Sequence, residues 1–100
     1  MSCSNLDRDI FIEIAVHHDR GGADLNLVRE GVDYRQKIAL SDLELMSGLE
    51  NLTQARLIRK LGSRYFVSSS AATTLPRTMS GEVSLSRKKW DRFRRTFLES

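Results

Sequence analysis

The chain has 100 residues, of which 40% are hydrophobic and 29% are charged, as in one ordinary globular domain. No stretch approaches the ~18 consecutive apolar residues of a membrane-spanning helix. The first residues lack the features of a secretion signal. The single cysteine, Cys3, excludes an internal disulfide. We therefore expect a cytoplasmic protein with no membrane partner.

Charge is distributed unevenly along the chain. Residues 1–55 carry five basic and ten acidic side chains, a net charge of −5, whereas residues 56–100 carry eleven basic and three acidic ones, a net charge of +8. Such asymmetry is typical of a basic surface that meets a polyanion, or of two faces that attract each other in a dimer. Compensation of the opposite charges within one fold is the alternative.

A helix is predicted from about residue 6, after a flexible N-terminus at residues 1–5. Ser4 and Asp7 have the spacing of a capping box, which satisfies free amides at the start of a helix. A strand is the rival interpretation, because residues 10–16 are rich in strand-forming side chains. The cap favours the helix. Residues at helical spacing form its two stripes: Leu6, Ile10, Ile14 and Phe11, Ala15, His18.

A second helix is predicted after Gly21 and Gly22, which break the first. Asp24 is placed to cap it, and Gly31 weakens it or marks a bend. Its inward and outward sets are Leu25, Val28, Val32 and Arg29, Glu30, Asp33.

A third helix is predicted after a connector from Gln36 to Leu40. Ser41 and Glu44 repeat the capping-box spacing, and the helix continues to about Gln54. Its buried stripe is Leu45, Leu49 and Leu52, flanked by Met46.

The chain then changes to an extended pattern. Residues 56–61 and 64–68 predict a β-hairpin that turns at Gly62 and Ser63. Residues 69–80 predict a mobile loop, because they begin with small polar side chains and contain Pro76. Residues 81–85 predict a short strand, and Ser86 is placed to cap a last helix from Arg87 to about Glu99. We therefore divide the chain into a flexible N-terminus (1–5), a core (6–68), a loop (69–80) and a strand with a basic amphipathic helix packed on the core (81–100).

Residues 41–58 (SDLELMSGLENLTQARLI) run directly into RYFVS at residues 64–68. The predicted third helix thus enters the hairpin without a long linker. Together with GVDY at residues 31–34, this segment resembles small bacterial winged helix-turn-helix proteins of unassigned function. The resemblance covers roughly residues 6–70. It implies a mainly α fold with a small β-hairpin, namely three helices, a wing and a C-terminal helix. A fold does not transfer a function.

The third helix is a poor candidate for reading DNA bases. Ser47, Asn51 and Gln54 lie on its outer face and could contact bases. However, Asp42, Glu44 and Glu50 would face the phosphates, whose neutralisation supplies most non-specific affinity. We therefore expect phosphate contacts to double-stranded DNA from the wing and the last helix. The candidate residues are Arg59, Lys60, Arg64, Arg87, Lys88, Lys89, Arg92 and Arg95, with Asn51 and Gln54 from the third helix.

The last helix has a second interpretation. Its charges can form an ordinary solvated face, with Asp91 paired to Arg95, above a core stripe of Trp90, Phe93 and Phe97. The same stripe could instead be the seam of a homodimer. The chain would then be a protein-interaction module that has lost DNA reading.

No residue pattern predicts catalysis, a metal or a cofactor. His17 and His18 are adjacent, and adjacent side chains on a helix diverge by about 100°. No second His or Cys cluster completes a tetrahedral site. A nucleophile pair of Cys3 and His17 would depend on a frayed terminus. We expect a protein that is not an enzyme.

Overall fold

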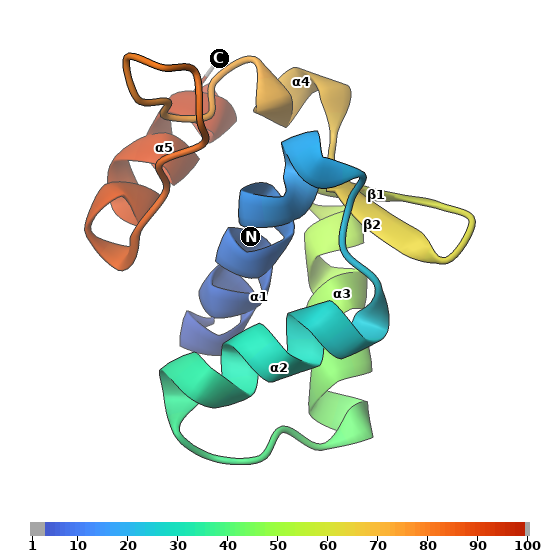
Figure 1. The fold of residues 1–100 in the computed structure, drawn as a ribbon. Helices are drawn as coiled ribbons and strands as arrows, with labels where there is room; N and C mark the ends of the chain where they lie inside the picture. Colours follow the sequence, from blue (N-terminus) through green and yellow to red (C-terminus); the bar gives the residue numbers. More distant parts are fainter. Residues whose placement is uncertain (1–3, 100) are drawn as a thin grey trace.

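The computed structural model describes residues 4–99 and measures 33 × 28 × 27 Å. This part of the chain is mainly helical, with five α-helices, one short 3-10 helix and one two-stranded antiparallel hairpin (Figure 1). The elements are α1 (Asn5–His17), η1 (His18–Arg20), α2 (Leu25–Gln36), α3 (Asp42–Gln54), β1 (Ile58–Leu61), β2 (Arg64–Val67), α4 (Ser69–Ala72) and α5 (Arg87–Glu99).

Helix α1 lies at the centre of the molecule, and the other helices pack around it (Figure 1). Ser4 and Asp7 form the predicted capping box, so the helical prediction is confirmed and the strand interpretation is wrong. Ser4 and Asn5 belong to this helix start, so the flexible segment predicted for residues 1–5 does not extend to them; residues 1–3, with Cys3, lie outside the described part. Burial extends around most of the helix, beyond the two predicted stripes: its buried residues are Asp7, Asp9, Ile10, Phe11, Ile12, Ile14 and Ala15.

Helix α2 begins at the predicted cap, where Asp24 accepts a hydrogen bond of 2.9 Å from the amide of Leu27. Val28 and Val32 are buried as predicted, but Leu25 is 38% exposed, so its inward placement is wrong. At this end of the helix, Leu27 packs against the core in its place.

Helix α3 carries the predicted capping box of Ser41 and Glu44. Its buried stripe of Leu45, Leu49 and Leu52 is also confirmed. The carboxylate of Asp33, from α2, accepts a bond of 2.8 Å from the amide of Leu40. This bond orders the connector between α2 and α3.

Two glycines let the neighbouring helices approach α1 closely. A Cβ at Gly31 of α2 would lie 2.1 Å from the Glu13 carboxyl carbon, and one at Gly48 of α3 would lie 2.4 Å from Ile10 Cδ1. Both separations are far below van der Waals contact. Gly31 therefore makes room for Glu13.

The hairpin joins Ile58 to Val67 at its base and Leu61 to Arg64 at its tip, as predicted. The segment before α2 adds one antiparallel bridge to the other edge of β2. There, Ala23 N donates to Tyr65 O at 3.0 Å and Tyr65 N donates to Ala23 O at 2.8 Å. The chain between the first two helices thus lies along the hairpin.

Two predictions fail between residues 69 and 85. Part of the predicted loop is helix α4, because the Ser68 hydroxyl caps the amide of Ala71 and the Ala71 side chain is buried. The predicted strand at residues 81–85 is a single bridge between Val83 and Arg77. Gly81, whose φ is +89°, lies in the turn that brings these two segments together.

Candidate nucleic-acid interface

The hairpin projects from the helical body and carries three exposed cations, Arg59, Lys60 and Arg64 (Figure 1). Arg59 stands across from Phe66, and Lys60 across from Tyr65. The Arg59 guanidinium carbon and Lys60 Nζ each lie 5.7 Å from the facing ring centroid, within the range of a cation–π contact. Because successive side chains of a strand point to opposite faces, the two cations lie on different faces of the hairpin. Lys60 is on the face that turns toward α3, where Tyr65 is buried and Glu50 lines the same pocket.

The base of the hairpin is held by a histidine. Val67 N donates a hydrogen bond of 3.2 Å to His18 Nδ1, which requires that nitrogen to be unprotonated. Burial lowers the pKa of His18 below its ordinary value of 6.5; Asp19 opposes this shift, whereas Arg77 and Arg59 add to it. The neutral imidazole therefore attaches the hairpin to the end of α1.

Helix α5 carries a second set of exposed cations on its outer face. Lys88, Arg92 and Arg95 are exposed and form no ion pair with any side chain that the structure describes. Asp91 and Arg95, both described, are likewise not paired with each other. Lys89 is also exposed but binds Ser84, donating from Nζ to the carbonyl at 3.1 Å and to the hydroxyl at 2.9 Å. Three side chains of the outer face therefore remain available for an anion.

Arg87, the first residue of α5, is occupied within the molecule. Its Nε and Nη2 donate to the two carboxylate oxygens of Asp9 at 3.1 and 2.7 Å. Asp9 is fully buried, and it also accepts bonds from Arg8 and Gln36. Burial alone would raise the pKa of Asp9, but the bonds from Arg87, Arg8 and Gln36 outweigh it and hold the pKa below 3.8. Arg87 therefore serves to dock α5 and is not a free cation.

The polar residues of α3 are also partly engaged. Asn51 Nδ2 donates to Asp7 Oδ2 at 3.3 Å, and Gln54 Nε2 donates to Glu50 Oε1 at 3.3 Å. Exposed apolar side chains, Leu43 at 77% and Met46 at 49%, lie on the same helix. The remaining exposed charges of α3 are the carboxylates of Asp42, Glu44 and Glu50.

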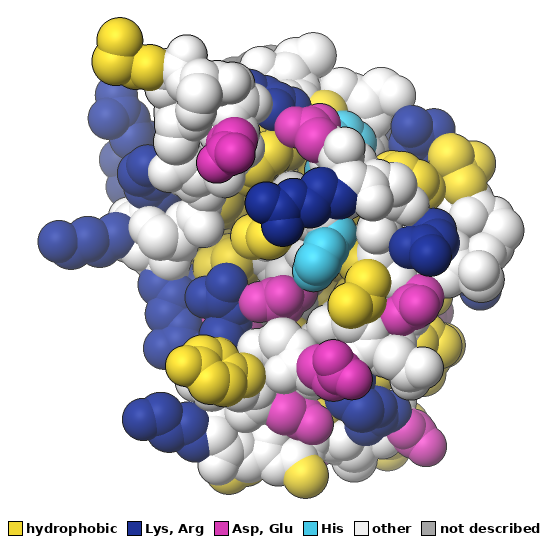
Figure 2. Space-filling view, viewed as in Figure 1, with side chains coloured by type: hydrophobic (Ala, Val, Ile, Leu, Met, Phe, Trp, Pro, Cys, Tyr) yellow, Lys and Arg dark blue, Asp and Glu magenta, His cyan; other side chains and the backbone are white. Residues whose placement is uncertain are grey.

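The two sets of cations do not form one surface. Helix α5 lies on one side of α1, and the hairpin projects from the other side (Figure 1). In the space-filling view, Lys and Arg gather along the edge over α5 and again over the hairpin (Figure 2). Carboxylates, histidine, apolar side chains and a few further Lys or Arg side chains lie between them. The cations of the wing and of the last helix, all expected to contact phosphates, thus lie in two groups.

The aromatic stripe of α5 packs within the chain. Trp90 and Phe93 are buried, and their ring centroids lie 5.3 and 5.2 Å from that of Phe11 on α1. Phe97 is half-buried beside Phe93. Trp90 and Phe93 are therefore core residues in a single copy of the chain.

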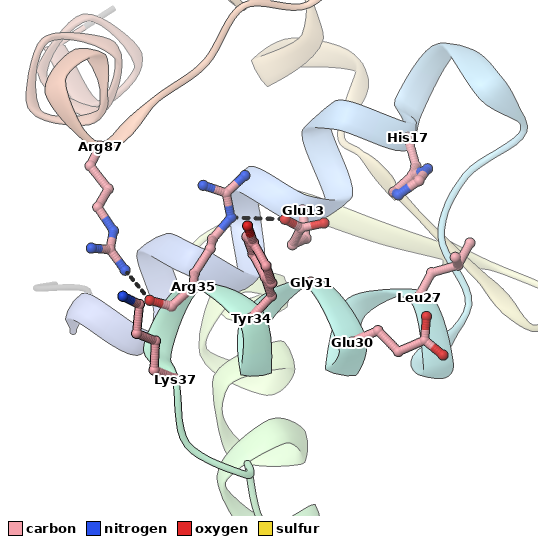
Figure 3. Close-up of a pocket in the computed structure, with 9 residues that line it drawn as sticks. All are labelled: Glu13, His17, Leu27, Glu30, Gly31, Tyr34, Arg35, Lys37 and Arg87. Carbon is pink, nitrogen blue, oxygen red and sulfur yellow. Dashed lines mark hydrogen bonds and ion pairs between the residues drawn. The ribbon is translucent and has the colours of Figure 1, made fainter.

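A groove of about 620 Å³ lies over α1 and α2, beside the start of α5 (Figure 3). Arg35 Nε binds Glu13 Oε1 at 2.8 Å inside it, and Arg87 Nη2 donates to the carbonyl of Arg35 at 3.3 Å. Lys37 lies at the cationic end, whereas His17 and Glu30 lie at the other. Both arginines of the groove are therefore already engaged within the chain, Arg35 with Glu13 and Arg87 with Asp9.

The histidines do not form a metal cluster. His17 lines the groove, whereas His18 faces β2. Among the described side chains, no group of three or more His, Cys, Asp or Glu residues could hold a metal ion. Cys3 lies outside the described residues.

Three positions that organise these surfaces were missed in the sequence. Asp9 directly precedes the apolar run at residues 10–16. A carboxylate that is buried beside such a run requires a partner, and this was the available signal. His18 was assigned to an apolar stripe, although its ring nitrogen accepts a backbone bond. No local pattern distinguishes Gly48 from an ordinary helical glycine.

The comparisons identify no relative: no family model, curated protein or solved structure matches the chain. None of the helices described is long and apolar enough to cross a membrane.

Proposed function

We propose that the chain is a winged helix-turn-helix module, without catalytic activity, that binds double-stranded DNA through its hairpin. The order α1, α2, α3, β1, β2 supports this assignment, as does the bridge that adds Ala23 to the edge of β2. Together they supply three helices, a wing and the position of a third, very short strand.

The placement of Arg59 and Lys60 on opposite faces of the hairpin carries this proposal. The major groove of B-DNA, about 12 Å wide, admits a two-stranded β-ribbon and has phosphates along both walls. A hairpin that enters this groove by its tip directs Arg59 to one wall and Lys60, on the face beside α3, to the other. Arg64 lies near the tip and also donates to the carbonyl of Gly22 at 3.4 Å. Such contacts position the protein without reading sequence.

The carboxylates of α3 oppose deep entry of that helix. Asp42, Glu44 and Glu50 are exposed along it. Asp42 is paired with Arg29, but Glu44 and Glu50 have no cationic partner among the described side chains and would approach a phosphate. The hairpin therefore makes the main contact, and binding is only weakly dependent on base sequence.

The test is fluorescence anisotropy of a labelled duplex as a function of salt. Three phosphate contacts predict a slope of about −2.7 in log K against log[salt], so affinity falls about 40-fold between about 50 and 200 mM salt. Arg59→Gln and Lys60→Gln should each reduce the magnitude of the slope by about 1. Lys37→Gln, at the far end of α2, removes the same charge and should leave the slope unchanged.

The two hairpin variants also test the mode of entry. Equal losses from Arg59→Gln and Lys60→Gln support contact with both walls, whereas a loss from one variant alone places a single face of the hairpin on the duplex. Absence of binding at about 50 mM salt would refute the proposal.

A second candidate function is self-association through opposite charges. The exposed carboxylates of α3 complement the cationic outer face of α5 in another copy. The apolar side chains of Leu43 and Met46 are exposed on the same helix. Such head-to-tail contacts are heterologous and form chains or rings. Sedimentation velocity without DNA tests this: mass that increases at low salt supports it, and a monomer at all salt concentrations excludes it.

A further inference from the structure

We propose that the outer face of α5 is a second phosphate-binding surface, so that one copy of the chain joins two DNA duplexes. The inference rests on the proposed binding of the first duplex by the hairpin. It adds a separate surface, with its own residues, on the other side of α1.

The cations of this surface lie in a single row. Lys88, Arg92 and Arg95 are spaced four and three residues apart, so they share one face of the helix. At 1.5 Å per residue the row is about 10 Å long. Phosphates along one strand of B-DNA are spaced about 3.4 Å apart along the axis, so the row can follow one strand.

The position of the row directs it away from the first duplex. Helix α5 and the hairpin lie on opposite sides of α1, in a molecule that is 27 Å across in its shortest dimension (Figures 1 and 2). A duplex that holds the hairpin in its groove therefore leaves Lys88, Arg92 and Arg95 facing solvent. A second duplex can approach them there.

The chemistry of α5 favours a nucleic acid over a lipid surface. Helices that lie in a membrane interface bury an apolar face among the lipids. In α5 this face is already used, because Trp90 and Phe93 are buried against Phe11. Arg87 fixes the orientation through Asp9, so the exposed side chains of residues 87–97 are charged or polar, with Asp91 and Thr96 beside the cations.

Capture of one duplex by another tests the inference. Biotinylated duplex on beads is mixed with protein and a fluorescent duplex of unrelated sequence, and the bound fluorescence is measured. Capture should rise and then fall as protein is added, because excess protein occupies each duplex separately. Lys88→Glu/Arg92→Glu should reduce capture at least about tenfold, yet keep affinity for one duplex within about threefold.

Two further variants separate this inference from the proposed function. The double variant Arg59→Glu/Lys60→Glu should also lose capture of the second duplex, while it retains weaker binding to a single duplex through α5. If this hairpin variant binds and captures like the wild type, the hairpin proposal fails. If the α5 variant captures like the wild type, the second surface is refuted.

Self-association and membrane binding are the remaining explanations to exclude. Glu50→Lys reverses a charge on α3 and should leave capture of the second duplex intact. Loss of capture in this variant, together with dimers of the wild type in sedimentation, would show that capture arises from pairing of copies and would overturn the inference. Co-sedimentation with phosphatidylserine vesicles that requires Lys88 and Arg92, without capture of a second duplex, would reassign α5 to a lipid surface. Circular dichroism must show native helix content in each variant.

Discussion

Arg87 and Asp9 are 78 positions apart in the sequence, yet two hydrogen bonds, of 3.1 and 2.7 Å, join the guanidinium of α5 to the buried carboxylate of α1. The pair links the acidic part of the chain to the basic part, as does Arg77 with Asp19. The net charges of −5 and +8 are thus partly compensated within the fold. The exposed cations of the hairpin and of α5 remain outside this compensation.

Replacement of Arg87 by Met should destabilise the protein more at neutral pH than in acid. The folded-state pKa of Asp9 lies below its ordinary value of 3.8, so its ionised form stabilises the fold above that pH. This contribution disappears as the pH falls through the folded-state pKa. Urea unfolding at pH 7, 5 and 3 should therefore show a difference between wild type and variant that shrinks at pH 3.

Lys88→Met is the matched control for Arg87→Met. It removes the neighbouring exposed cation, which has no ion pair with the described side chains, and should change stability by less than about 0.5 kcal/mol. A difference for Arg87→Met that is independent of pH would contradict the role of Asp9.

Stability should also fall as His18 becomes protonated. Because burial lowers its folded-state pKa below 6.5, the unfolded chain takes up the proton first. The free energy of unfolding therefore decreases as pH falls below about 6.5 and levels off below the folded-state pKa. Urea unfolding at pH 7.5 and 5.5 measures this loss.

His18→Asn should remove most of this pH dependence, because its side-chain oxygen can replace Nδ1 as acceptor for Val67 N without titrating. His17→Asn, at the adjacent position on the groove, should leave the dependence in place. The opposite pattern would assign the titration to His17.

Replacement of Gly48 by Ala should destabilise the fold although alanine favours helix. The added Cβ would lie 2.4 Å from Ile10 Cδ1 in the core, and such overpacking costs about 1–3 kcal/mol. The gain in helix propensity, about 1 kcal/mol, offsets only part of it. Urea unfolding should show a net loss, whereas Ser47→Ala, at an exposed position of the same helix, should be neutral or slightly stabilising.

Truncation of Trp90 to Ala should loosen α5 from the core. The indole is buried against Phe11 and Phe93, and loss of a buried aromatic side chain costs about 3–5 kcal/mol. Urea unfolding followed by circular dichroism measures this cost. Met79→Ala, at a fully exposed position, should have no effect; an equally stable Trp90→Ala would contradict the packing of α5.

Local features of this protein follow from short stretches of sequence. The capping boxes at Ser4 and Ser41, the cap at Asp24 and the turn at Gly62 depend on residues within about four positions of one another. The sequence therefore predicts four helices and a hairpin, in order and with nearly correct bounds, including the last helix from Arg87 to Glu99. It also shows that positive charge is concentrated after residue 55.

The arrangement of that charge depends on the tertiary structure. Because α1 occupies the centre, the hairpin and α5 lie on opposite sides of it, and their cations lie in two groups (Figures 1 and 2). The same packing buries Asp9, pairs it with Arg87, and places Gly31 and Gly48 where a side chain would clash. These relationships join residues far apart in the chain, so no local pattern contains them.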